Sequence, residues 1–251
     1  MSKTPTMRID RLLANMGYGS RRDIEHMSYG RRIVLDGQAI KDVSARIAIT
    51  QDLPNRLSVD GAPLDPPPGL IVALNKPLGV TCSHKDSGPL VYDLLPQRWR
   101  ARDPIISTVG RLDKDTSGLL LMTDDGPLLH RIIAPRSHVS KRYQVKLARP
   151  LKGDEAVIFG AGGLMLESEQ KPLLPADFQP LSETSGLLTL HEGRYHQVRR
   201  MFAAIGNHVE ELHRDRIGSL DLPADLEAGQ WRLLDEAQIA AIFAAPPPAA
   251  I

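Results

Sequence analysis

The sequence has little of several features that would identify common protein classes. Only one of its 251 residues is a cysteine, Cys82, which excludes an intramolecular disulfide and a Cys-rich zinc site and fits a reducing compartment. No run of apolar residues is long enough for a transmembrane helix. The first six residues also lack the apolar core of a signal peptide. We therefore expect a cytoplasmic protein without a membrane-embedded part.

Signatures of nucleotide, hydrolase and metal chemistry are also missing. The sequence contains no GxxxxGK[ST] loop, no HExxH and no GxSxG. The glycine-rich segment 160–163 has the wrong spacing for a dinucleotide fingerprint, and we interpret it as a turn. The eight histidines are scattered without the spacing of metal ligands. We therefore expect neither a cofactor nor a metal ion.

The net charge of +1 is low for a nucleic-acid-binding protein, but the charge is unevenly distributed. Residues 1–60 hold 10 Lys/Arg and 7 Asp/Glu, whereas the remainder holds 21 and 23. Within that remainder, the segment 126–153 contains seven basic residues and no acidic one. Such a block can bind phosphates even in a nearly neutral chain, although a solvated basic face gives the same pattern.

Hydrophobic spacing predicts two helices and a small sheet in the first 60 residues. The apolar positions in 9–16 follow the i, i+3, i+4, i+7 pattern of an amphipathic helix, which the glycines of 17–19 end. Ser20 is the expected N-cap of a second helix, with an acid three residues later. A strand is expected at 32–35, followed by an Asp-Gly hairpin turn at 36–37.

The segment 65–69, Asp-Pro-Pro-Pro-Gly, is the clearest linker, because consecutive prolines make a stiff spacer. An apolar run at 70–74 predicts the first strand of a second domain. Further strands and a helix are expected at 143–147, 186–190 and 196–205. Since strands and helices do not alternate strictly, an α+β fold is favoured. Residues 244–251 are expected to be a disordered tail.

Three polar segments are candidates for reactive groups. Asp113 lies in a polar stretch before the apolar strand 119–122, and a neighbouring cation such as Arg111 keeps a carboxylate ionised. Tyr143 lies in a basic strand, where it can stack on a base or move a proton. Arg199 and Arg200 open a helix, and Arg is a preformed fork for carboxylate or phosphate. Ordinary turn chemistry, packing and a solvent-facing pair are the respective alternatives.

Together these segments resemble the motifs of the pseudouridine synthases, in the order and spacing of that family. Residues 110–113 with 116–119 resemble the central motif, and 75–79 (Asn-Lys-Pro-Leu-Gly) resembles the N-K-P-x-G motif. Residues 141–143 are similar to the strand that supplies the active-site tyrosine, and 193–201 are similar to the third motif. Residues 8–12 and 19–21 resemble an S4 RNA-binding domain, and the whole resemblance covers about residues 7–240.

The resemblance implies an α+β fold of two domains. A small S4-like helix–helix–sheet domain at 7–64 would be joined by the linker 65–69 to a catalytic domain at 70–243. The catalytic domain would hold a mixed, mainly antiparallel sheet flanked by helices, and 244–251 would follow as the tail.

The resemblance also implies the reaction, an isomerisation of uridine to pseudouridine that needs no cofactor. The stretch 192–218 is most similar to members that act on 16S rRNA during maturation of the small ribosomal subunit, which implies uridine 516 as the target. A 23S rRNA target is the alternative within the family. A non-catalytic RNA-binding assembly factor is the alternative outside enzymes. The partner would be rRNA in a partly assembled subunit, and the protein is expected to be a monomer.

The motifs imply roles for individual residues. Asp113 would be the catalytic carboxylate, Arg199 would pair with it, and Tyr143 would lie against the uracil ring. The residues expected to contact substrate or RNA are Arg111, Arg21, Arg22, Lys141, Arg194, His196 and Arg200, together with the basic block around 131–152. Lys76 would either contact RNA or support the loop architecture.

Overall fold

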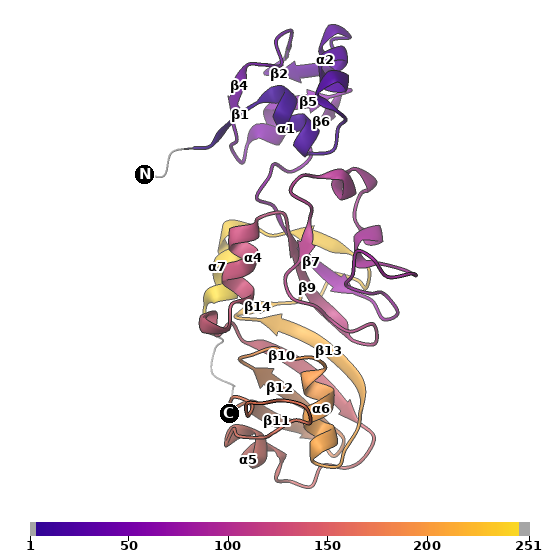
Figure 1. Cartoon of the computed structure of the whole chain (residues 1–251), viewed down its shortest axis with the longest axis vertical. Coiled ribbons are helices and arrows are strands. Elements are labelled where there is room, and N and C mark those ends of the chain that lie inside the picture. The colour runs from indigo at the N-terminus through magenta and orange to yellow at the C-terminus, as the bar shows by residue number, and fades with distance from the viewer. Residues whose placement is uncertain (1–3, 246–251) are drawn as a thin grey trace. The chain divides into compact units, whose positions relative to one another are not determined.

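The computed structural model describes residues 4–245, and the chain forms two compact units (Figure 1). The first unit contains the residues up to 71 together with 95–107 and 123–126. The second unit contains 72–94, 108–122 and the chain from 127 onward. The predicted disordered tail falls largely on 246–251, which lie outside the described residues.

The first unit begins with the two predicted helices and the small sheet. Helices α1 (Ile9–Asn15) and α2 (Arg21–Tyr29) pack on each other, and Ser20 caps α2 through a capping box with Asp23. Leu35 pairs with Gln38 across Asp36 and Gly37, which both have positive φ, so the predicted Asp-Gly hairpin is confirmed. The sheet order is β3 (Gln38–Ala39), β2 (Ile33–Leu35), β5 (Leu57–Val59), β6 (Ala62–Pro63). Strands β1 (Thr6–Arg8) and β4 (Arg46–Ala48) pair separately, and α3 spans Leu53–Arg56.

A buried ion pair joins the later segments of the first unit to its earlier part. Arg102 and Asp124 contact each other at 3.0 Å, with side chains only 1% and 2% exposed. Arg102 also donates two hydrogen bonds to the carbonyl of Pro66, and Asp124 accepts one from the amide of Gly69. These bonds explain why the segments 95–107 and 123–126 belong to the first unit, although they follow residue 71 in the sequence.

The proline-rich segment 65–69, which the sequence predicts to be a stiff spacer, is held by hydrogen bonds to other parts of the first unit. Asp65 receives a hydrogen bond from Arg98 and donates its own amide to the hydroxyl of Tyr18. With the bonds of Pro66 and Gly69, both ends of the segment 65–69 are held within the first unit. Sequence spacing misses this because the partners lie far along the chain.

The second unit is built on a mixed sheet of nine strands. The order is β11 (Asp177–Ser182), β12 (Ser185–Leu190), β10 (Lys141–Leu147), β13 (Val209–Ile217), β9 (Ser117–Thr123), β7 (Ile71–Lys76), β15 (Trp231–Leu233). Strand β14 (Leu220–Asp221) pairs with β13, and β8 (Ser107–Thr108) pairs with β9. The β13–β9 pairing is parallel, whereas β10 pairs antiparallel with both β12 and β13. The predicted α+β fold with a mixed, mainly antiparallel sheet is confirmed.

Helices lie against this sheet (Figure 1). Helix α5 (Glu155–Gly160) contacts β11, α6 (Gln197–Ala204) contacts β13, and α7 (Glu236–Phe243) contacts β14. Phe159 of α5, Phe178 of β11 and Phe202 of α6 meet edge to face, with ring centroids 5.2 to 6.0 Å apart. The remaining helical elements are α4 (Gly126–Ile133) and the 3₁₀ turns η1 (Val91–Leu94), η2 (Gln97–Ala101) and η3 (Pro135–Ser137).

A glycine makes the parallel contact between β9 and β13 possible. Gly118 has φ of +103°, and it lies directly opposite Arg214 in the register of the two strands. A Cβ atom at this position would overlap the backbone carbonyl of Arg214. Only glycine combines this φ with so close an approach. The close packing of β9 against β13 therefore requires glycine at this position of the central motif.

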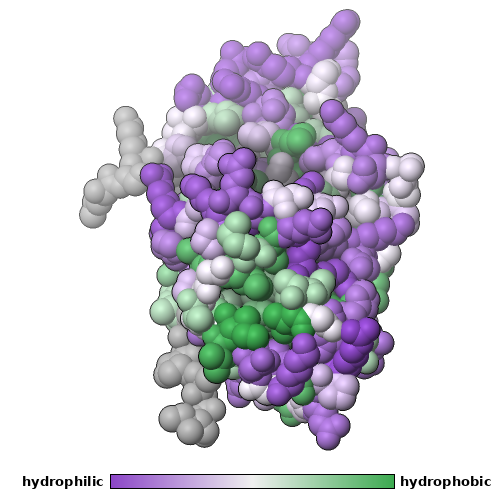
Figure 2. Space-filling model, turned by 60° about the horizontal axis from the view of Figure 1, so that its bottom comes forward, coloured by the Kyte–Doolittle hydropathy of each residue, from purple (hydrophilic) through white to green (hydrophobic). Residues whose placement is uncertain are grey.

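The surface is mainly hydrophilic but not uniformly so. Figure 2 shows one group of hydrophobic side chains among hydrophilic ones on the face it presents. Large exposed apolar side chains in the second unit include Val157 of α5 and Leu181 of β11. The monomeric state therefore stays a prediction. Within residues 4–245, no helix has the length and apolar character needed to cross a membrane.

The Arg102–Asp124 pair gives a stability prediction. Asp124→Asn leaves Arg102 charged and buried without its counter-ion, so we expect a loss of about 3–5 kcal/mol in unfolding free energy. Urea unfolding of the full chain measures it. Asp225→Asn is the matched control, because Asp225 and its partner Arg232 are exposed and an exposed ion pair contributes little to stability. Equal effects of the two substitutions would contradict the assigned role of the buried pair.

Candidate active site

A pocket in the second unit collects most of the residues that the sequence singled out. Its volume is 720 Å³, and it is open to solvent. The loop before β9 contributes Asp113, β10 contributes Lys141 and Tyr143, β13 contributes Arg214, and the turn before α6 contributes His196. Strands β10, β13 and β9 are adjacent in the sheet, which explains why residues from distant parts of the sequence meet here.

Asp113 is a partly exposed carboxylate at the start of a turn. Its side chain is 31% exposed, and its backbone carbonyl accepts a hydrogen bond from the amide of Thr116. The Oδ1 atom lies 3.3 Å from Nε2 of His196, a contact that becomes an ion pair when the ring is protonated. The carboxylate is thus held on one side and open to the pocket on the other.

Lys76 fixes the loop that carries Asp113. The side chain is fully buried and donates hydrogen bonds to the carbonyls of Pro77 and Thr116, at 3.0 and 2.8 Å. Burial lowers the pKa of Lys76, although Cys82, Asp113 and Asp115 act in the opposite direction. Because the ammonium group is fully buried, these contacts favour support of the loop over an RNA contact, the two roles expected for Lys76.

Arg199 does not form the predicted pair with Asp113. Its guanidinium contacts the carboxylate of Asp115 at 3.0 Å and donates a hydrogen bond to the carbonyl of Val209. The reason lies in the start of α6, where His196 stands just before the first turn and is the residue that reaches Asp113. Arg199 thus ties the same loop to β13 through a neighbouring carboxylate.

Arg214 is the site residue that sequence reasoning missed. It is 3% exposed, and its Nε donates a hydrogen bond to the carbonyl of Leu119 in β9. Nη1 lies 3.4 Å from the hydroxyl of Tyr143, while Nη2 is buried and has no hydrogen-bond partner among the described residues. One sequence signal was present: Leu212 and Arg214 share a face of β13, so an arginine occupies a core-facing position.

Lys141 has an altered basicity in the same pocket. Burial and, to a smaller extent, the charge of Arg214 lower the pKa of Lys141 to about 8. Its Nζ donates a hydrogen bond to the carbonyl of Val139 at 2.9 Å. The side chain therefore loses its charge over the mildly alkaline range, unlike an ordinary lysine.

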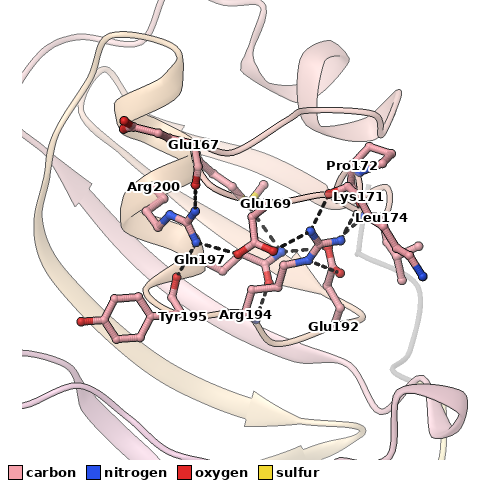
Figure 3. Close-up of polar contacts among 11 residues, drawn as sticks. Glu167, Glu169, Lys171, Pro172, Leu174, Glu192, Arg194, Tyr195, Gln197 and Arg200 are labelled. Carbon is pink, nitrogen blue, oxygen red and sulfur yellow. Dashed lines mark hydrogen bonds and ion pairs between the residues drawn. The ribbon is translucent and has the colours of Figure 1, made fainter.

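Arg194 and Arg200 use their donors within the protein (Figure 3). Arg194 contacts Glu169 and Glu192 and donates to the carbonyls of Lys171 and Pro172. Arg200 contacts Glu169 and donates to the carbonyls of Glu167 and Tyr195. The predicted RNA contacts of both arginines are not supported, because their guanidinium groups hold the turn before α6.

The basic block also differs from the sequence-based expectation. Arg142 pairs with Asp215, and Lys146 pairs with Glu211, both across the β10–β13 pairing. Arg149 and Lys152 donate to the carbonyls of Gly206 and Ile205. Much of the block therefore neutralises acids or caps carbonyls, which the charge count could not reveal.

The other predicted RNA contacts lie on the surface. Arg111 is exposed and lines the pocket. In the first unit Arg22 is exposed, whereas Arg21 donates to the buried carboxylate of Asp10 at 2.7 Å while remaining 58% exposed. Within the described range 4–245, no cluster of three or more His, Cys, Asp or Glu side chains is arranged to hold a metal ion.

Comparison with known proteins identifies the family. The model of the RNA pseudouridylate synthase family matches residues 70–204. Ribosomal small subunit pseudouridine synthase A of Escherichia coli K12 is 41% identical over 240 residues, covering 94% of this chain and all of the relative. The enzyme of the same name from Yersinia pestis is 40% identical over 95% of this chain and 99% of its own.

A solved structure agrees with these relatives. A crystal structure described as a pseudouridylate synthase aligns with a TM-score of 0.66 and 34% identity, covering 94% of this chain and 99% of its own. The fold, the motifs and the matched length therefore lead to one conclusion: the chain belongs to the RNA pseudouridylate synthase family.

Proposed function

We propose that this enzyme isomerises one uridine of 16S rRNA, uridine 516, to pseudouridine during maturation of the small ribosomal subunit. The observation that carries the proposal is the pocket in which Asp113 and Tyr143 face the same open space. The choice of 16S rRNA rests on the relatives that match 94% of the chain, whose names specify the small subunit.

The reaction breaks one bond and forms another on the same nucleotide. The N1–C1′ bond of the uridine breaks, the uracil turns, C5 bonds to C1′, the proton on C5 leaves, and N1 takes up a proton. Asp113 either attacks C1′ or removes a proton from the sugar, and both routes need an ionised carboxylate within reach of the ribose. Because the reaction changes neither the oxidation state nor the composition of the nucleotide, side chains alone can carry it.

Tyr143 and Arg214 prepare the site for the uracil. We infer that Tyr143 lies against the ring and helps to remove the C5 proton. Arg214 lies beside the tyrosine, with its guanidinium carbon 5.9 Å from the ring centroid. Its buried Nη2 offers a donor to an oxygen in the pocket, either on Asp113 or on the uracil. Arg214 thus takes the role of nearby cation that the motifs assigned to Arg199.

The target must leave its base stack to reach Asp113. Arg111, exposed at the edge of the pocket, is placed to fill or hold the vacated position. In the S4-like first unit, Arg21 and Arg22 would contact RNA phosphates. Since much of the basic block is internally paired, a partly assembled particle is the favoured form of the substrate.

The first prediction concerns Asp113→Asn, which is nearly isosteric. We expect it to abolish turnover while RNA binding and folding survive, because the amide can neither attack C1′ nor accept a proton. The measurement is tritium release from RNA labelled at uridine C5, since forming the C5–C1′ bond expels that tritium. Activity close to that of the unchanged enzyme would remove Asp113 from its assigned role.

The same assay distinguishes the substrates. Labelled 16S and 23S rRNA are offered separately, each as naked RNA and as partial particles. Release from 16S rRNA alone, faster from the particle and lost when uridine 516 is replaced by cytidine, supports the whole proposal. Release from 23S rRNA alone would keep the chemistry and overturn the target. No release from any form would favour a non-catalytic RNA-binding factor.

A second prediction distinguishes the role of Arg214 from that of Arg199. Arg214→Gln should lower kcat by about 10²-fold or more, because it removes a buried charge inside the pocket. Arg199→Ala should have a smaller effect, because Arg199 pairs with Asp115 and can influence Asp113 only by holding the loop that carries both residues. Single-turnover rates at saturating RNA compare the two. A larger loss of activity for Arg199→Ala would instead support the Arg199–Asp113 pair that the motifs imply.

A third prediction follows from the pKa of Lys141. The charged form is present below its pKa of about 8 and is lost as the pH rises through that value. We therefore expect RNA affinity to fall between about pH 7 and 9, because one cation in the pocket disappears. Lys141→Arg is the matched control, since arginine stays charged over this range. Parallel pH profiles for the two proteins would contradict the role of Lys141.

A further inference from the structure

Tyr195 is a large aromatic residue that packing does not explain. It is 68% exposed, yet it lines the pocket that contains Asp113. Its ring stacks on the ring of His196, with centroids 3.9 Å apart and an angle of 17° between the planes. One face of the tyrosine is therefore backed by a second ring. The side chain buries too little of its surface for a role in the core.

The backbone at this turn is in an uncommon conformation. His196 has φ of +48° and ψ of +34°, in the left-handed region that favours glycine. Such a conformation costs free energy and persists only where the surroundings determine it. The position of His196 matters to the site, because the same ring contacts Asp113.

A network of hydrogen bonds and ion pairs surrounds this turn (Figure 3). Arg200 donates a hydrogen bond at 3.1 Å to the carbonyl of Tyr195 and also contacts the carboxylate of Glu169 at 3.0 Å. Glu169 also contacts Arg194, whose amide donates to the side chain of Gln197. Figure 3 shows the Tyr195 ring directed away from this network. The network thus holds the backbone of the turn and leaves the ring outside it.

A flat aromatic surface held in this way is suited to a nucleobase. Stacking of bases on aromatic side chains is a general mode of recognition for unpaired RNA. A base next to a flipped uridine loses a stacking neighbour, so a protein ring can replace it. The uracil itself is assigned to Tyr143 in the pocket, whereas Tyr195 is the more exposed of the two tyrosines.

We infer that Tyr195, backed by His196, is a stacking platform for a nucleobase adjacent to the target uridine, and that Glu169 positions this platform through Arg200. The inference rests on the proposed function for its substrate, an RNA whose target uridine leaves the stack. It assigns Tyr195 to binding and not to the reaction itself.

The test uses an RNA fragment that spans uridine 516 of 16S rRNA and measures both affinity and turnover. Tyr195→Ala should weaken binding roughly 5- to 150-fold, the range for one base–aromatic stack, with kcat largely retained. Tyr195→Phe should bind like the unchanged enzyme, because it keeps the ring face. Equal losses in the two variants would assign the effect to the hydroxyl and overturn the platform.

An abasic nucleotide on the 5′ or the 3′ side of the target identifies the stacked base. At one of these positions the abasic RNA should weaken binding to the unchanged enzyme but should not further weaken binding to Tyr195→Ala. Additive losses at both positions would overturn the inference. Failure of the proposed function appears elsewhere, as absent tritium release by the unchanged enzyme from unmodified RNA, and the variant comparison then moves to the 23S fragment that is turned over.

The positioning role of Glu169 is tested in the same assay. Glu169→Gln keeps the size of the side chain and removes the charge that Arg194 and Arg200 share. We expect weaker RNA binding from this variant alone, and no further loss when it is combined with Tyr195→Ala. A merely structural role would lower thermal stability without this non-additivity. Independent, additive effects would remove Glu169 from the proposal.

Discussion

The active site depends on the parallel contact between β9 and β13. Without a side chain at Gly118, the two strands approach closely at Arg214. The contact fixes the end of the loop that carries Asp113, and it places the guanidinium of Arg214 against the carbonyl of Leu119. Lys76 holds the other side of the same loop through the carbonyl of Thr116. A carboxylate and a buried cation from distant segments thus line one pocket because two backbones meet where only glycine fits.

Charge in this protein is mostly organised in pairs. Arg142, Lys146, Arg194 and Arg200 each contact a carboxylate, so a chain of net charge +1 has fewer available cations than its composition suggests. Attraction to phosphates then depends on exposed basic residues such as Arg111 and Arg22. Recognition of RNA by such a surface relies more on shape and stacking than on long-range electrostatic attraction.

Local features could be predicted from the sequence, and long-range partners could not. The cap at Ser20, the hairpin at Asp36 and Gly37, and the helix after His196 follow from neighbouring residues, and the structure contains them. The family motifs led to the shared pocket of Asp113 and Tyr143. The partner of Arg199 and the burial of Arg214 depend on strand pairing between distant segments. Spacing along the chain carries no information about that pairing, so the sequence could not show that Arg199 pairs with Asp115.

The Arg102–Asp124 pair has a consequence for the order of events during synthesis. The carbonyl of Pro66 and the amide of Gly69 find their partners only on residues that follow them by 36 and 55 positions. At about 5–20 residues per second, the ribosome needs roughly 3–11 s to extend the chain from Gly69 to Asp124. The first unit therefore cannot reach its final form while residues 1–71 are the only part of the chain that has been made. Its completion is coupled to the emergence of the first strands of the catalytic sheet.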